Sequence, residues 1–68
     1  DRQASYGHPR IDFARTASYW SNYLAAKISP EDVPMMMILL KVSREQNRHK
    51  RDNLVDICGY AGTRMMLE

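Results

Sequence analysis

Residues 29–42 read SPEDVPMMMILLKV, and they combine a helix start with the longest uninterrupted apolar run of the chain. A serine followed by proline and two acids is typical of a helix N-terminus. The hydroxyl accepts from free backbone N–H groups there, and the acids face the positive end of the helix dipole. From Val33 to Val42 only Pro34 and Lys41 interrupt the apolar residues. We therefore predict a helix over residues 30–46 that is apolar on nearly every side.

Such a helix needs more cover than a short chain provides. A helix that is apolar all round is buried all round, and two neighbouring helices in a chain of 68 residues leave part of it open. Small domains are usually reinforced by disulfides, a metal or oligomerisation. The single cysteine, Cys58, excludes an intrachain disulfide, and His8 and His49 are too few for a tetrahedral zinc site. The sequence thus predicts a homo-oligomer.

Two further helices flank this one. Apolar residues recur at steps of four, three and four over about residues 10–26, which indicates one buried helical face: Phe13, Ala17, Trp20 and Leu24. A similar stripe predicts a helix over about residues 52–66: Leu54, Ile57 or Cys58, Ala61 and Met65. Residues 1–9 lack apolar periodicity and predict a lead-in loop. We expect one all-α domain over residues 1–68, a three-helix chain that completes its core by oligomerisation.

Composition argues against several partners. The net charge is only +2, and the basic run at residues 47–51 contains no aromatic residue, so we do not expect nucleic acid to bind. The apolar run from Met35 to Leu40 is far shorter than the roughly 20 residues that span a bilayer. A free thiol and the lack of a targeting segment favour a reducing compartment. We therefore expect a cytoplasmic protein without a membrane partner, and Cys58 is expected to be an inert buried thiol.

Charged residues gather on both sides of the second turn. Lys41, Arg44 and Arg48 lie on one face of the second helix, and Asp52, Asp56 and Tyr60 lie on one face of the third. If the two helices are antiparallel, Arg44 falls opposite Asp56 and Arg48 falls beside Asp52. This spacing predicts a shared charged site at the turn.

Two interpretations of this site stay open. In the functional one, Asp52 and Asp56 hold Mg²⁺ while the cations bind phosphate oxygens. In the structural one, the charges form salt bridges and Asp52 caps its helix, which is the interpretation that its position favours. For Asp56 the two interpretations weigh equally. The candidate ligand-binding residues are Lys41, Arg44, Arg48, Arg51, Tyr6 and Tyr60. No catalytic residue is predicted, because the chain has neither a phosphate-binding glycine loop nor a nucleophile elbow.

Four segments together resemble a known family. They are DRQASYGHP at residues 1–9, Asp12-Phe13 with Trp20, KVSRE at residues 41–45, and KRDNLVDICGY at residues 50–60. They are similar to short phage and prophage proteins, frequent in actinobacteriophage genomes, whose function is unassigned. The resemblance covers nearly the whole chain, and it implies a bacterial host cell as the setting.

Residues 52–60 show a more distant resemblance. They are similar to the last helix of the all-α nucleotide pyrophosphohydrolases, the MazG-like group. That group holds Mg²⁺ with Glu-Glu-x-x-Glu on one helix and Glu-x-x-Asp on the next. Asp56 matches the final aspartate, whereas Asn53 occupies the preceding glutamate position and the first acidic cluster is missing. This resemblance implies an architecture that holds a nucleotide without the full metal set.

These observations rank three functions. The first is an oligomeric helical protein that binds a nucleotide or a nucleotide-derived signal without turnover and without a cofactor. The second is a nucleotide pyrophosphohydrolase that depends on Mg²⁺, with acids pooled from two chains. The third is a protein-binding module directed at a host factor. The ranking leans against an enzyme.

Overall fold

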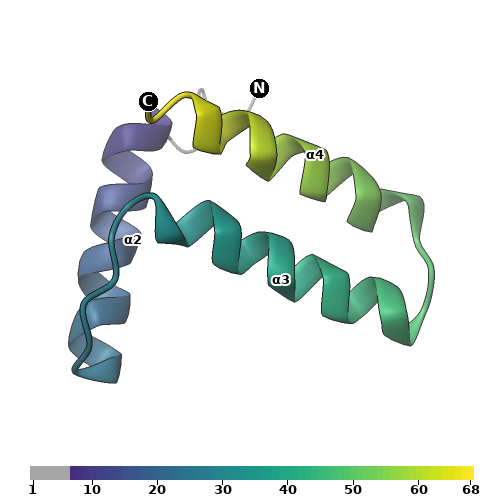
Figure 1. The fold of residues 1–68 in the computed structure, drawn as a ribbon, viewed down its shortest axis with the longest axis horizontal. Helices are drawn as coiled ribbons and strands as arrows, with labels where there is room; N and C mark the ends of the chain where they lie inside the picture. Colours follow the sequence, from purple (N-terminus) through teal and green to yellow (C-terminus); the bar gives the residue numbers. More distant parts are fainter. Residues whose placement is uncertain (1–6) are drawn as a thin grey trace.

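The computed structural model describes residues 7–68, which form three helices: α2 (Pro9–Leu24), α3 (Asp32–Asn47) and α4 (Arg51–Met65). Helices α3 and α4 lie side by side and antiparallel (Figure 1). Helix α2 crosses the end of this hairpin at which α3 begins and α4 ends (Figure 1). The predicted three-helix, all-α fold is confirmed over the described residues, none of which is in a strand.

Helix α2 is fixed at both ends by local geometry. The Nδ1 atom of His8 accepts a hydrogen bond from the Arg10 backbone N–H at 3.1 Å, and Pro9 occupies the first helical position. His8, predicted as part of the lead-in loop, is therefore the N-cap. At the other end Ala25 adopts a left-handed conformation with φ of 51°. This conformation ends the helix at Leu24, two residues before the predicted end.

The predicted N-cap of α3 is wrong, because the N-cap is Glu31 and it makes no side-chain capping bond, but Ser29 and Asp32 bond to each other just before the helix. The Ser29 hydroxyl accepts from the Asp32 backbone N–H at 3.3 Å, and the Asp32 carboxylate accepts from the Ser29 backbone N–H at 2.9 Å. The Ser29 N–H, followed by its hydroxyl, lowers the pKa of Asp32. Pro30 and Glu31 form a turn inside this loop of bonds, so α3 begins two residues later than predicted.

The link between α2 and α3 is tied to α2 by one hydroxyl. Ser21 accepts from the Ile28 backbone N–H at 2.9 Å and donates to the Ile28 carbonyl at 3.2 Å. Both polar backbone groups of Ile28 are thus satisfied while its side chain packs on the core.

The core is small and lies where α2 crosses the hairpin. Phe13, Ala17 and Val33 are buried, and four partly buried side chains pack around them: Trp20, Ile28, Tyr60 and Leu67. The predicted stripe of α2 therefore faces the core, except that Leu24 is exposed.

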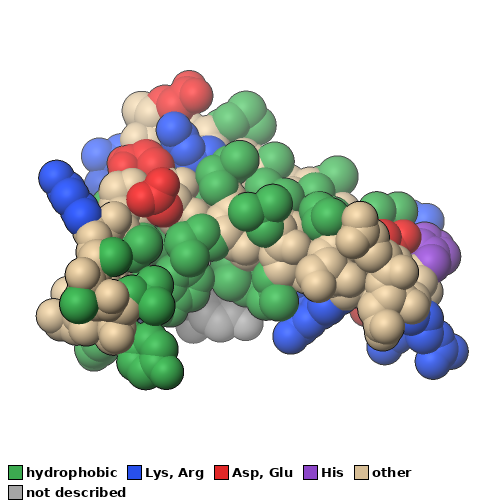
Figure 2. Space-filling model, turned by 60° about the horizontal axis from the view of Figure 1, so that its bottom comes forward, with side chains coloured by type: hydrophobic (Ala, Val, Ile, Leu, Met, Phe, Trp, Pro, Cys, Tyr) green, Lys and Arg blue, Asp and Glu red, His purple; other side chains and the backbone are tan. Residues whose placement is uncertain are grey.

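Several large apolar residues of the hairpin face outward. On α3, Met35, Leu39, Leu40 and Val42 are exposed, and hydrophobic side chains spread across the side of the molecule that α3 forms (Figure 2). On α4 the predicted inward stripe is wrong. Leu54, Cys58, Ala61 and Met65 are exposed, and of the predicted residues Ile57, the alternative to Cys58, is half-buried. The face towards α3 carries Asn53, Asp56, Tyr60 and Thr63. Periodicity located the apolar stripe of α4, but the polar face is the one that packs within the chain. Cys58 is consequently an exposed thiol rather than a buried one.

Candidate anion-binding site

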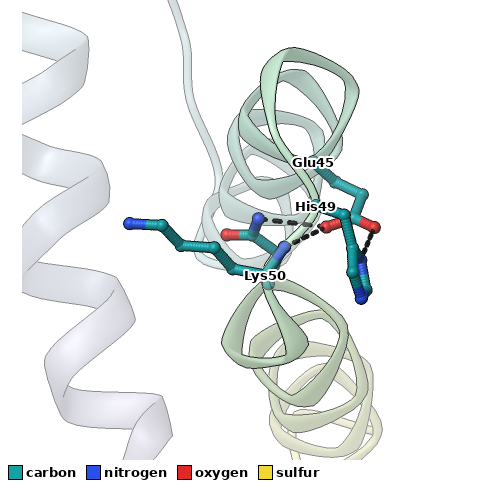
Figure 3. A network of polar contacts seen from close by, with 4 residues as sticks. Glu45, His49 and Lys50 are labelled. Atoms are coloured by element: carbon teal, nitrogen blue, oxygen red, sulfur yellow. Dashed lines mark hydrogen bonds and ion pairs between the residues drawn. The ribbon is translucent and has the colours of Figure 1, made fainter.

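One carboxylate closes the turn between α3 and α4 (Figure 3). The Glu45 Oε1 atom accepts from the Lys50 backbone N–H and from the Asn53 side-chain amide, each at 3.1 Å, and its Oε2 atom contacts the His49 ring. Asn53 is buried. The His49 contact, followed by those of Asn53 and Lys50, lowers the pKa of Glu45. Glu45 therefore stabilises the turn and fixes where the two helices meet.

These bonds determine how the turn presents its charges. With its backbone held by Glu45, Lys50 extends its side chain away from that carboxylate, towards the side on which α2 stands (Figure 3). Lys50 is also the N-cap residue of α4 and makes no side-chain capping bond. The predicted capping role of Asp52 is thus wrong, because α4 begins at Arg51 and Asp52 lies inside its first turn.

The register of the hairpin differs from the predicted one. Lys41 Nζ lies 2.9 Å from Asp56 Oδ2, and the two side chains are 16% and 33% exposed. Lys41 therefore takes the place predicted for Arg44, because the positions of α3 that face α4 are residues 41 and 45, one turn apart. The predicted contact of Arg48 with Asp52 is also absent from the ion pairs of residues 7–68. Arg48 follows the last helical residue with an extended backbone and so leaves the face of α3.

The charged residues line one open hollow of about 680 Å³ beside the turn. Its charged walls are Lys41, Arg44, Arg48, Lys50, Asp52 and Asp56. We call this the cationic hollow, because four cations face two carboxylates and one carboxylate is already paired with Lys41. Within residues 7–68, Arg44, Arg48 and Lys50 have no carboxylate partner. The hollow thus brings together five of the predicted site residues, and it also contains Lys50, which the sequence did not single out. The five are Lys41, Arg44, Arg48, Asp52 and Asp56.

The other predicted site residues lie elsewhere. Arg51 is exposed at the first position of α4 and does not line the cationic hollow. Tyr6 lies outside the described residues. Tyr60 lines a second open cavity of about 230 Å³, to which all three helices contribute residues.

Three aromatic residues, Phe13, Trp20 and Tyr60, are among the residues that line this second cavity. Its walls include Asp12, Phe13, Trp20, Met37, Tyr60 and Thr63, and we call it the aromatic cavity. The Thr63 hydroxyl donates to the Tyr60 carbonyl at 3.0 Å, one turn earlier on α4. The sequence placed Trp20 in the core but gave no sign of Asp12 or Thr63 beside it. No local pattern could have, because the walls come from three separate helices.

The two cavities follow one another along the hairpin. Met37 of the aromatic cavity precedes Lys41 of the cationic hollow by one turn of α3, and Tyr60 follows Asp56 by one turn of α4. Residues four apart lie on the same helical face, about 6 Å apart along the axis. Among residues 7–68 no group of three or more His, Cys, Asp or Glu side chains is placed to hold a metal ion.

Comparison with known proteins adds the family. Residues 1–68 match a domain of unknown function, DUF6378. The Gene 55 proteins of Mycobacterium phages D29 and L5 are each 43% identical to the chain over 63 residues. The aligned region covers 91% and 90% of this chain but 42% and 40% of those relatives, so the chain spans less than half of their length. No solved structure matches.

The names of these relatives state no ligand and no activity. The distant resemblance to nucleotide pyrophosphohydrolases therefore stays a prediction, whereas the resemblance to phage proteins of unassigned function is confirmed. None of the described helices has both the length and the apolar content that crossing a bilayer requires. The chain belongs to the DUF6378 family, which includes mycobacteriophage proteins and carries no assigned function.

Proposed function

We propose that this domain binds a nucleotide, or a signal derived from one, without cleaving it, and that the phosphates occupy the cationic hollow. One observation carries the proposal: Arg44, Arg48 and Lys50 line a single hollow without a carboxylate partner in the described part of the chain. Guanidinium groups bind phosphate oxygens through two parallel hydrogen bonds, and an ammonium group adds a point charge. An anion with several oxygens would neutralise this excess of positive charge.

The aromatic cavity is the proposed place of the base. At about 230 Å³ it is smaller than the roughly 300–1,000 Å³ usual for whole ligands, which suits one ring system rather than a complete nucleotide. Trp20 brings an aromatic ring to the lining of this cavity and Asp12 brings a carboxylate, groups that suit the face and the edge of a base. The two cavities would thus share one ligand, with its sugar between them.

The acidic residues favour binding over cleavage. Asp56 is held by Lys41, which leaves Asp52 as the acid of the hollow without an ion-pair partner within residues 7–68. Cleavage assisted by two metals needs several carboxylates to offset the ionic charge, and water attack needs a general base. The unpaired Asp52 favours one second candidate, the Mg²⁺-dependent pyrophosphohydrolase, in which a second copy of the chain would supply the missing acids. In both cases we propose a homo-oligomer.

A combined thermal-shift and fluorescence assay tests the proposal. Pyrophosphate should raise Tm through the cationic hollow alone, and its effect should fall with rising salt. Mono-, di- and cyclic nucleotides should also change the emission of Trp20, the single tryptophan of the chain, because their bases reach the aromatic cavity.

Matched variants locate the effect. Arg44→Ala and Arg48→Ala should each weaken binding, whereas Arg15→Ala, at an exposed position of α2 outside the hollow, should not. The proposal is wrong if no phosphate compound stabilises the protein. Release of pyrophosphate that requires Mg²⁺ and is abolished by Asp56→Ala would establish the enzyme instead. Neither stabilisation nor turnover would leave the host-factor module as the better interpretation.

A further inference from the structure

The outward face of α4 carries a regular apolar stripe. Leu54, Cys58, Ala61 and Met65 follow each other at steps of four, three and four, and all four are exposed. We call them the outer stripe of α4. Its two large side chains, Leu54 and Met65, are 47% and 64% exposed. The opposite face of α4 packs on α3, so nothing in the described part of the chain covers the outer stripe.

The order of sizes along the outer stripe is symmetric. It runs large, small, small, large, with its centre between residues 59 and 60. If two copies of α4 pack antiparallel about a twofold axis at that centre, Leu54 of one copy meets Met65 of the other, and Cys58 meets Ala61. The small central residues let the helices approach, and the large ones fill the space at each end. A twofold interface requires this kind of self-complementary surface.

The charges beyond the stripe obey the same symmetry. The axis that pairs Leu54 with Met65 also pairs Arg51, at the start of α4, with Glu68, just past its end. Both side chains are exposed, and neither has an ion-pair partner within residues 7–68. A parallel pairing would instead bring like charges together. Charge complementarity therefore selects a second copy of this chain in the antiparallel orientation.

Gly62 gives an independent reason for a close neighbour. Glycine inside a helix costs about 1 kcal/mol relative to alanine. A Cβ atom added at Gly62 would meet nothing within 4 Å in the chain, so packing between α2, α3 and α4 does not require glycine there. A second helix that packs closely against the outer stripe does provide a reason, because Gly62 adjoins Cys58 and Ala61 on the helix surface.

The exposed face of α3 is less suited to self-pairing. Its apolar residues Met35, Leu39 and Val42 pair symmetrically only if Met35 meets Val42 of the second copy. On that face Asp32 precedes Met35 and the uncharged Gln46 follows Val42, so no pair of opposite charges would form between the two copies. We propose that two copies of the chain associate through their α4 helices, antiparallel, with Leu54 against Met65, Cys58 against Ala61 and Arg51 against Glu68.

Sedimentation velocity on the 68-residue chain tests this interface. The wild type should sediment as a dimer at tens of micromolar. Ala61→Glu places a charge at the centre of the interface and should raise the dissociation constant at least about tenfold while circular dichroism stays unchanged. Ala14→Glu, the same substitution at an exposed position of α2, should leave the dimer intact.

Charge reversal tests the antiparallel pairing directly. Arg51→Glu and Glu68→Arg should each weaken the dimer, and the two together in one chain should restore it. The proposal is overturned if the wild type stays monomeric at 0.5 mM, a concentration about 500 times a dissociation constant of 1 μM. It is equally overturned if Leu39→Glu, but not Ala61→Glu, dissociates the dimer, or if the combined reversal fails to restore it.

Discussion

The ion pair between Lys41 and Asp56 joins α3 to α4 and lines the cationic hollow. Lys41→Met keeps the aliphatic stem and Asp56→Asn keeps the shape, so each removes one charge with little change in volume. Exposed pairs contribute about 0.2–1 kcal/mol, whereas a fully buried charge left unpaired costs about 3–5 kcal/mol. With an Nζ–Oδ2 distance of 2.9 Å and side chains 16% and 33% exposed, this pair lies between those cases. We expect a coupling free energy of about 1–2 kcal/mol.

A double-mutant cycle measured by urea unfolding gives this coupling. In a domain of this size, 1 kcal/mol corresponds to a shift of about 4–8 °C in Tm, so thermal melts provide a second measurement. Asp56→Asn should cost more than Lys41→Met, because it leaves the less exposed charge unpaired. The matched control is a second double-mutant cycle, which combines Arg44→Met with Asp56→Asn. Its coupling free energy should stay within about 0.5 kcal/mol. A larger coupling for Arg44 than for Lys41 would refute the register described above.

Three further predictions concern the supports of the fold. Ser21→Ala leaves both backbone groups of Ile28 without their partner and should cost about 1–3 kcal/mol in urea unfolding, whereas Ser18→Ala, at an exposed position of the same helix, should be nearly neutral. Phe13→Ala should cost about 3–5 kcal/mol, a large share of the stability of 68 residues, and a Tm near that of wild type would contradict it. The hydrogen bonds of Glu45 lower its pKa in the folded protein. Its contribution to the free energy of unfolding is therefore complete above the ordinary pKa of glutamate and is lost as the pH falls through the lowered pKa of the folded state. The advantage of wild type over Glu45→Gln in unfolding free energy should therefore shrink in acid, and a constant advantage would argue against this role.

Sequence patterns predicted the features that depend on neighbouring residues. Ser29 and Asp32 bond to each other at the predicted start signal, because both lie within one turn, although the N-cap of α3 is Glu31 rather than Ser29. Phe13 and Ala17 of the α2 stripe both reach the core, because residues four apart lie on one helical face. In each case the physical cause lies inside a window of a few residues.

The features that the sequence did not predict depend on how distant segments meet. Lys41 and Arg44 are both cations near the turn, and only the bonds that Glu45 makes to Lys50 and Asn53 determine which of them faces Asp56. The apolar stripe of α4 was located correctly, but periodicity does not state which neighbour covers it. The aromatic cavity requires the crossing of α2 over the hairpin, which no local pattern specifies.

Helix α4 contributes its polar face to the proposed anion-binding site and its apolar face to the proposed dimer interface, so the two proposals can be tested separately. A single domain gains most by turning apolar groups inward, at about 25 cal/mol per Å². Here α4 turns Asn53 and Asp56 inward and Leu54 and Met65 outward. The inward polar groups fix the register and leave cations facing the hollow, whereas the outward groups gain stability only when another surface covers them. If this division holds, Asp56→Asn should strengthen pyrophosphate binding, because it releases Lys41, and should leave the dimer unchanged. Ala61→Glu should dissociate the dimer and leave binding of pyrophosphate unchanged. A variant set in which every substitution weakens both properties would show that the two faces are not independent.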